Sequence, residues 1–555
     1  MTTTGTQAPA VTTREWWLIG VLTAVAALLR GWSLHSAGLV QYDEGVYAFS
    51  GLGIIDPSQP FRTFPQQEKF SPPFHILMVA LSYLIGGVSD RSIVLLNVVS
   101  GTLTVPVLWL IGRRWFGPAA GAAAATLLAF GPTHLTLSRS GLTDVAFALN
   151  FLVAVFALVW ALEEGGNWRA VLAGLATGLA WNTKYHGWFA GAIAIGAVLA
   201  LHLRDRQIDE TRRRFRTLVI AAVVAVACYI PWAIYIQSQP GSMEGWSRYF
   251  ATMLRLDWLG NFWRHVQQQE YLEIGLSRFS IPLAVVAATI AHRGPVQQQL
   301  KQVLPILAVV LVSALALGSF GTATLATIVM IPSMMKRGGV AEWVLVGWIA
   351  LWVVMAPVYH PYFRLLLPFC IATCLGAGQL LSMHLTAASA ASDRRGLMLG
   401  LSALTAAIVL GVAARVRPAV ADPWRWGDAM RSTAATLTTM IPEGARVTII
   451  GEPALAFYLH RAGRPAFESP TPEDIASMQS TGYLITGVYT NRAKALRAAV
   501  DARRAELDSV ATLHVEPNDL RLLDDARPPG ARAYRSAPDS TFDITLFRFH
   551  GRGSR

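Results

Sequence analysis

The sequence has few charged residues and few cysteines for its length of 555 residues. Only 14% of its residues are Asp, Glu, Lys or Arg, whereas an average soluble domain carries about 25%. This shortage and the hydrophobic content of 53% exclude a disordered chain and argue against an ordinary soluble enzyme. Cys228, Cys370 and Cys374 all lie inside apolar runs, so the sequence encodes neither a disulfide scaffold nor a cysteine-based zinc site.

The formal net charge of +12 comes from basic residues that sit mostly between apolar runs. In a soluble protein such a charge would first suggest nucleic acid as a partner. Between hydrophobic runs it indicates the positive-inside bias of a membrane protein.

Long apolar runs dominate the chain as far as residue 415. Residues 1–15 are polar and lack the features of a cleavable signal peptide, so we predict a cytoplasmic tail followed by a signal anchor at 16–34. The run at 72–87 is too short for an ordinary span and is expected to be re-entrant or interfacial. The remaining runs lie at about 91–112, 118–138, 143–162, 169–184, 187–203, 217–237, 279–292, 302–319, 321–335, 340–358, 362–383 and 396–414.

The basic residues set the expected orientation. If 72–87 does not span, the basic loops all fall on one side, which is then cytoplasmic. We therefore predict about thirteen transmembrane helices within residues 16–415 and an outward-facing C-terminal end. The first outer loop is 35–71, and a large outer loop is 238–278. The basic loops are those with Arg113 and Arg114, Arg204 to Arg216, His292 to Lys301, Lys336 and Arg337, and Arg394 and Arg395.

Residues 420–555 are charged and rich in proline, with a pattern typical of a soluble domain. Strands are predicted at 446–450, 483–486 and 542–549, and helices at 454–461 and 491–507. The predicted fold is thus an all-α polytopic membrane bundle with a small extracytoplasmic α/β domain.

Charged residues gather at the predicted outward ends of the spans, where such residues are usually functional. The structural alternatives are a solvated turn at Asp43, an Arg–Asp pair that joins a hairpin, and an interfacial lysine. The carboxylates are Asp43, Glu44 and Asp144, and the cations are Lys69, Arg139, Lys184 and Arg364. Neighbouring candidates for substrate binding are Tyr47, Tyr185, His186, His360 and Tyr362.

This set of side chains suits a phosphate leaving group carried on a lipid. Phosphate needs charge stabilisation more than a general acid, and a carboxylate can remove a proton from an acceptor hydroxyl. His75, His134 and His384 lack zinc-ligand spacing and are interpreted as structural. We predict no metal-binding residues; the sequence establishes no cofactor and leaves a divalent metal open.

At these residues the chain resembles the GT-C superfamily of polyprenyl-phosphate-sugar glycosyltransferases. The protein O-mannosyltransferase and lipid A aminoarabinose transferase group is the most similar. The resemblance covers roughly residues 16–385 and rests on the order and spacing of several short motifs. These are Asp43 to Tyr47, Lys69 to Pro73 with Ser71 inserted, Arg113 to Gly117, Ser138 to Asp144, Thr183 with Lys184, and Tyr362 to Pro368.

The resemblance implies an extracytoplasmic active site, a polyprenyl-phosphate-linked sugar donor and inversion at the anomeric carbon. By this analogy Asp43 is the catalytic base with Glu44 supporting it, and Asp144 orients a substrate. Lys184, Arg139 and Arg364 would hold the phosphate.

Two alternatives stay open: a transporter or flippase for a lipid-linked sugar, and a membrane scaffold that presents residues 420–555. The expected location is the plasma (inner) membrane, with the lipid bilayer, the lipid-linked donor and an acceptor glycan, lipid or protein as partners. The sugar, the acceptor and the oligomeric state are not predicted. The oligosaccharyltransferase Trp-Trp-Asp signature is absent from the sequence, which argues against N-glycosylation.

Overall fold

The computed structural model describes residues 10–57, 71–238, 256–272, 338–390, 428–464, 466–468, 471–515 and 542–550, and the single residues 247, 254 and 524. The chain divides into two compact units. We call the first the helical unit (Met1–Trp32, Val98–Ser138 and Thr143–Ala419) and the second the mixed unit (Ser33–Asn97, Arg139–Leu142 and Val420–Arg555).

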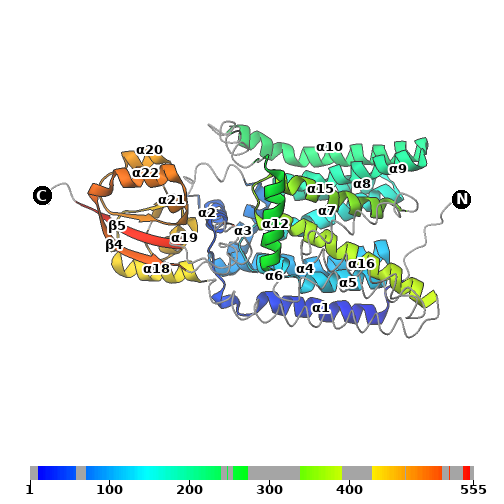
Figure 1. The fold of residues 1–555 in the computed structure, drawn as a ribbon, viewed down its shortest axis with the longest axis horizontal. Coiled ribbons are helices and arrows are strands. Elements are labelled where there is room, and N and C mark those ends of the chain that lie inside the picture. The colour runs from blue at the N-terminus through cyan, green and yellow to red at the C-terminus, as the bar shows by residue number, and fades with distance from the viewer. Residues whose placement is uncertain are drawn as a thin grey trace. The chain divides into compact units, whose positions relative to one another are not determined.

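The helical unit is a bundle of apolar helices (Figure 1). Its helices are α1 (Thr13–Gly31), the greater part of α4 (Asp90–Phe116), α5 (Pro118–Ala129), α6 (Pro132–Leu137), α7 (Asp144–Glu164), α8 (Asn167–Thr183), α9 (Phe189–Asp205), α10 (Ile208–Ser238), α12 (Trp258–Leu272), α15 (Val340–Met355) and α16 (Leu367–Ala390). Short 3-10 helices are η4 (Tyr185–Trp188), η6 (Ala356–Val358) and η7 (Phe363–Leu366).

Within the described residues, six helical segments are long and apolar enough to cross a membrane. The helix α7 has 21 residues, which at 1.5 Å per residue gives about 31 Å, close to the thickness of the hydrocarbon core. The protein is therefore a multi-pass membrane protein. The prediction of thirteen spans stays a prediction, because the runs at 279–292, 302–319, 321–335 and 396–414 lie outside the described residues.

The predicted run at 118–138 differs from the structure. It is broken into α5 and α6, which are separated by Phe130 and Gly131. Pro132 begins α6, and a proline inside a continuous helix would remove one backbone hydrogen bond and clash with the preceding turn. The short run at 72–87 forms α3 (Pro73–Gly86), whose 14 residues are fewer than an ordinary span requires.

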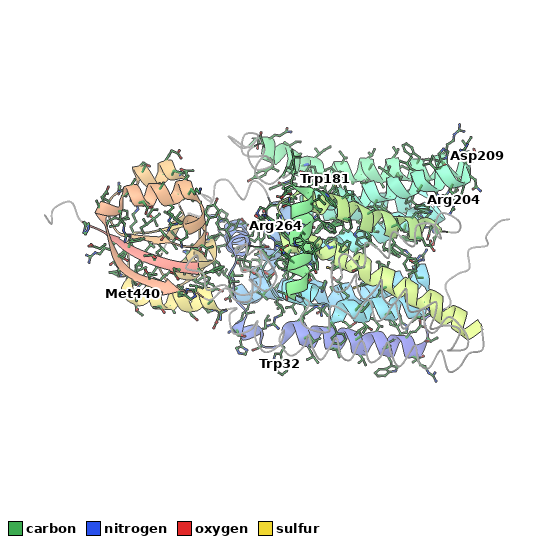
Figure 2. All side chains as sticks on the ribbon, in the orientation of Figure 1. Trp32, Trp181, Arg204, Asp209, Arg264 and Met440 are labelled. Atoms are coloured by element: carbon green, nitrogen blue, oxygen red, sulfur yellow. The ribbon has the colours of Figure 1, made fainter. Side chains whose placement is uncertain are left out.

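One end of the helical unit carries several basic residues of the predicted cytoplasmic loops. Arg113 near the end of α4 pairs with Glu15 at the start of α1, with 2.8 Å between Nε and Oε1. Arg114 pairs with Glu164, the last residue of α7. Figure 2 shows Arg204 and Asp209 together at the junction of α9 and α10. The start of α7 and the end of α8 therefore lie at the opposite end of these helices.

The mixed unit contains α2 (Tyr42–Ile55), α3, the first turns of α4 and a sheet with its helices. The sheet has the order β2-β1-β3-β5-β4. The strands are β1 (Val447–Ile450), β2 (Ala466–Glu468), β3 (Tyr483–Thr486), β4 (Leu507–His514) and β5 (Asp543–Phe549). The pairs β1–β2 and β1–β3 are parallel, whereas β5 pairs antiparallel with β3 and β4.

Helices cover both faces of this sheet. In Figure 1, α18 (Ala429–Met440) and α19 (Pro453–Arg461) lie on one face, and α20 (Pro472–Ser477) and α22 (Lys494–Ala502) lie on the other. The last helix of the unit, α21 (Val488–Arg492), follows β3. A core cluster beneath α20 and α22 includes Ile450, Leu484, Leu496 and Phe547. A small sheet with helices on both faces is therefore present, and a separate C-terminal α/β domain and its extracytoplasmic location stay predictions.

Candidate active site

The start of α2 holds both carboxylates of the acidic motif, in different surroundings. Asp43 lies half-buried in the first turn, and its backbone N–H donates to the side chain of Gln41, the N-cap residue (2.7 Å). A carboxylate in the first turn is stabilised by the helix dipole. Glu44 has no exposed surface, and its Oε2 accepts hydrogen bonds from the backbone N–H groups of Val40 and Gln41, both at 2.8 Å.

Glu44 also holds the segment that carries Arg139. Its Oε1 accepts the backbone N–H of Gly141 at 2.6 Å, so one buried carboxylate accepts three backbone donors. A Cβ at Gly141 would meet Glu44 Cβ at 3.5 Å and Ile93 Cγ2 at 3.0 Å, which explains the glycine in this tight approach. The structure thus gives Glu44 contacts that fix α2 and residues 139–142 to each other.

Other side chains hold the same segment. The Nδ2 of Asn97, on α4, donates to the carbonyl oxygens of Ser140 (2.6 Å) and Leu142 (2.5 Å). His75 on α3 lies with Nε2 3.2 Å from the carbonyl oxygen of Gly141. This contact agrees with the structural interpretation of His75. Its ring also meets the edge of Tyr47, with 5.1 Å between the ring centroids.

Arg139 is carried by this fixed segment. Its side chain is largely buried, and burial lowers the pKa of the guanidinium below its ordinary value. A poorly hydrated cation favours an anionic partner, such as a phosphate.

We expect Glu44→Gln to destabilise the protein by about 1–3 kcal/mol, because the amide NH₂ cannot accept the donors that now meet a carboxylate. Thermal unfolding of the purified protein measures this change. The matched control is Glu473→Gln, which alters an exposed carboxylate on α20. Equal unfolding temperatures for the two variants would contradict the structural role of Glu44.

A second group of charges lies in the helical unit, where Asp144 begins α7. Its side chain is 2% exposed and forms an ion pair with Lys184, the C-cap residue that follows α8. Arg364, in η7, forms an ion pair with the other carboxylate oxygen of Asp144, with 3.8 Å between Nη1 and Oδ2. One carboxylate between two cations leaves an excess of one positive charge. We call these three residues the cation cluster.

Aromatic side chains surround the cation cluster. The guanidinium carbon of Arg364 lies 4.9 Å from the ring centroid of Tyr362, and His360 lies 4.3 Å from the same ring. His186 meets the edge of Phe147, at 4.5 Å between the ring centroids. These rings form a partly apolar wall, in which a charge interaction is stronger than in water.

The turn at Gly187 brings Lys184 to this place. The N–H of Gly187 donates to the carbonyl of Lys184 at 2.8 Å, and η4 folds back on α8. A Cβ at Gly187 would lie 2.3 Å from the backbone carbon of Ala180 and the backbone nitrogen of Trp181. Backbone atoms cannot give way as a flexible side chain does, so only glycine fits this position.

We expect Gly187→Ala to destabilise the protein by about 1–3 kcal/mol, because the added methyl group overpacks η4 against α8. The same change should weaken the binding of a phosphate-bearing ligand, because Lys184 is displaced. Thermal unfolding and ligand titration measure the two effects. Gly196→Ala is the control, since nothing lies within 4 Å of a Cβ at that position of α9. A Gly187→Ala protein as stable as the control would contradict this packing argument.

The polar face of α12 was not predicted from the sequence. Asn261 Nδ2 donates to the carbonyl of Pro357 at 2.8 Å, and Gln268 Nε2 donates to that of Pro361 at 2.7 Å. His265 is buried between them, and burial lowers its pKa to about 4, so the ring is neutral near pH 7. These side chains hold the backbone of the segment that leads to Arg364. The spacing of four and three residues was the signal, because it places the three polar side chains on one helix face.

Arg30, near the end of α1, was also missed. Its guanidinium is fully buried and donates to the carbonyl oxygens of Leu128 and Ala129, the last residues of α5, at 3.4 and 3.2 Å. It also lies 2.8 Å from Nδ1 of His134. A cation at the C-terminal end of a helix is stabilised by the helix dipole. The contact supports the structural interpretation of His134.

The structure divides the predicted site residues between the two units. Asp43, Glu44, Tyr47 and Arg139 belong to the mixed unit, and the cation cluster belongs to the helical unit with Tyr185, His186, His360 and Tyr362. Lys69, a predicted site residue, and the side chain of His384 lie outside the described residues. Within the described part of the chain, no group of three or more His, Cys, Asp or Glu is arranged to hold a metal ion.

A family model described as dolichyl-phosphate-mannose-protein mannosyltransferase matches residues 71–235, which include α7, α8 and two members of the cation cluster. A crystal structure of ArnT from Cupriavidus metallidurans, bound to undecaprenyl phosphate, aligns with 98% of this chain and 100% of its own, with a TM-score of 0.57 and 14% identity. The chain resembles this mannosyltransferase family over residues 71–235 and shares its fold with ArnT.

A second solved structure shares the fold. The archaeal oligosaccharyltransferase AglB from Archaeoglobus fulgidus, in complex with an inhibitory peptide and a dolichol-phosphate, aligns with 90% of this chain and 72% of its own. The TM-score is 0.53 and the identity is 13%. Identities this low establish a common fold and do not identify the substrates of this protein.

Two curated relatives come from Bacillus subtilis (strain 168). YkcB and YycA, which are provisionally named as mannosyltransferases, are each 23% identical over 171 residues, or 31% of this chain. The matched segment spans 23% and 24% of their respective lengths, or about a quarter. The match thus concerns about a third of this chain and about a quarter of each relative.

Proposed function

We propose that this protein is a membrane glycosyltransferase that moves a sugar from a polyprenyl-phosphate donor to an acceptor hydroxyl group. The observation that carries the proposal is the cation cluster, which has one more positive charge than negative charge and lies beside aromatic rings. A phosphate on a lipid carrier is an anion suited to such a place. The ArnT structure supports this choice, because that GT-C protein was crystallised with undecaprenyl phosphate.

In the proposed reaction, Asp43 acts as the base. Its carboxylate removes the proton of an acceptor hydroxyl while the hydroxyl oxygen attacks the anomeric carbon of the donor sugar. The bond between that carbon and the phosphate oxygen breaks, and the lipid phosphate leaves with the electron pair. Attack from the face opposite the phosphate inverts the anomeric carbon, and the proton remains on Asp43.

The other candidate residues then have supporting roles. Lys184 and Arg364 stabilise the charge that grows on the leaving phosphate, and Asp144 holds both cations in place. We propose that Arg139 and Lys69 contribute further positive charge. Glu44 is a positioning residue, because its three contacts with backbone N–H groups fix α2 and residues 139–142.

The proposed location is the plasma membrane, with the reaction on the extracytoplasmic side. Arg113 and Arg114, from a predicted basic loop, form their ion pairs at the end of α7 and α8 that is opposite the cation cluster. By the positive-inside rule, that basic end faces the cytoplasm.

Donor binding tests the proposal without an identified acceptor. The purified protein in lipid nanodiscs is titrated with undecaprenyl phosphate, and binding is measured at low and high salt. Saturable binding that weakens as salt rises is expected, because the contacts are ionic. No saturable binding of the lipid phosphate would reject the proposed donor class.

A further inference from the structure

The sheet of the mixed unit has a topological switch point between β1 and β3. These neighbouring parallel strands lead to helices on opposite faces, because β1 continues into α19 and β3 continues through α21 into α22 (Figure 1). In open α/β sheets the crevice outside the carboxyl ends of such strands is the usual place for a ligand.

In this protein the helix α2 lies at that place. A Cβ on Gly45 of α2 would be 2.2 Å from the backbone nitrogen of Ala454 and 2.3 Å from the carbonyl carbon of Pro453, at the start of α19. The ring of Tyr42 lies 5.4 Å from that of Tyr489, in α21. The first half of α2 therefore contacts the segments that follow both strands.

The loops after the two strands also close on each other. The carboxylate of Glu452 is buried and accepts the backbone N–H of Val488 at 2.7 Å. Gly451 has φ +75°, and a Cβ there would lie 2.3 Å from Tyr489 Cβ. Side chains and backbone of the chain itself occupy the region where a small ligand would otherwise bind.

A second contact fixes the residues just before α2. The hydroxyl of Tyr458, on α19, donates to Oδ2 of Asp90 at 2.6 Å and accepts the backbone N–H of Leu39 at 2.8 Å. Arg431 pairs with the same Asp90 carboxylate and donates to the carbonyl of Ala37 at 2.7 Å. Burial, followed by the charge of Asp90, raises the pKa of Tyr458 well above its ordinary value, so its hydroxyl keeps the proton that it donates.

We propose that the sheet β1–β5 and its helices, which we call the α/β domain, form a positioning device. This domain binds α2 in place of a ligand and thereby sets the position of Asp43. Gly45 and Tyr458 are the positioning residues, through the close contact with α19 and the tie to Asp90 and Leu39. Gly45 follows Asp43 by two residues on the same helix, so a shift at one moves the other. This inference rests on the proposed function, in which Asp43 is the base.

The test compares two glycines of one helix in the full-length protein. We expect Gly45→Ala to lower kcat for sugar transfer by roughly 100-fold, because a displacement of about 1 Å near the reacting group can cost that much. The KM for the lipid-linked donor should stay within about twofold, because the cation cluster is unchanged. Gly53→Ala is the control, since nothing lies within 4 Å of a Cβ at Gly53.

Hydrogen exchange of the α2 amides gives a readout that needs no enzymatic activity. We expect faster exchange over residues 42–55 in Gly45→Ala and not in Gly53→Ala. If the wild-type protein transfers no sugar, the proposed function fails, and this comparison still decides whether the domain holds α2. Faster exchange with unchanged kcat would overturn the positioning role, and unchanged exchange would overturn the contact itself.

Tyr458→Phe is a second variant that tests the same proposal if the Gly45→Ala protein does not fold. It removes one hydroxyl and keeps the ring. We expect a lower kcat, an unchanged donor KM and faster exchange at residues 39–45. Wild-type kcat in Tyr458→Phe would overturn the role of Tyr458.

Discussion

Asp43→Asn is expected to lower kcat for sugar transfer on the order of a thousandfold, which is within the range that a general base supplies. The change replaces one carboxylate oxygen with an NH₂ group of similar size, so the first turn of α2 should keep its structure. Transfer from the lipid-linked donor is measured by release of polyprenyl phosphate. Binding of the donor should remain, because the cation cluster is untouched.

Asp56→Asn is the matched control for this variant. Asp56 caps the other end of α2, and its side chain is also partly buried. We expect wild-type turnover in the control. Asp43→Asn with wild-type turnover would remove Asp43 from the mechanism, and loss of donor binding in that variant would assign Asp43 to binding in place of catalysis.

The largest expected effect on donor binding comes from the double change Lys184→Gln and Arg364→Gln. Each cation is expected to contribute about 2 kcal/mol to phosphate binding, and together they contribute about 4 kcal/mol, on the order of a thousandfold in Kd. The net charge of the cluster changes from +1 to −1, because Asp144 remains. Direct titration of the protein with undecaprenyl phosphate measures the loss.

The control removes the same two charges elsewhere in the helical unit. Arg206 and Arg264, the second of which is labelled in Figure 2, both have exposed side chains. Arg206→Gln with Arg264→Gln should bind the lipid phosphate with nearly unchanged affinity, because exposed charges are screened by salt. Equal losses in the two double variants would show that overall charge attracts the lipid and that the cation cluster is no specific site.

Hydrophobic periodicity and the positions of turn-forming residues predicted much of the fold. The strand at 483–486 agrees with β3, and the helix at 454–461 agrees closely with α19. The helix predicted at 491–507 is wrong at its end, because α22 stops at Ala502 and Leu507 begins β4. That strand is mostly exposed at the edge of the sheet, so it lacks the buried alternation by which a strand is recognised.

The sequence predicted which residues belong to the candidate site better than it predicted which contacts they make. Charges at the ends of spans indicated Asp144, Lys184 and Arg364, and the structure brings these three together. Their pairing was not predictable, because the partners are 40 and 220 residues away from Asp144. The contacts of Glu44 with backbone N–H groups could not be predicted from the sequence. Nearly every residue type has a backbone N–H, so the sequence does not show which residues donate.

The contact of α2 with the α/β domain could not be predicted from the sequence either. Gly45 is an ordinary glycine in the sequence, and its need for glycine follows from the approach of α19, which comes more than 400 residues later. Tyr458 and Asp90, which form a hydrogen bond, are 368 residues apart in the sequence. Such contacts follow from tertiary structure and have no local pattern.

One assay tests the central claim most directly. The wild-type protein and Asp43→Asn, each in lipid nanodiscs, are incubated with a panel of radiolabelled polyprenyl-phosphate sugars. We predict that the wild-type protein releases sugar from a donor of the panel, and that Asp43→Asn binds the same donor and releases none. Release at equal rates by both proteins, or transport of an intact donor across a vesicle membrane with no release, would contradict the account.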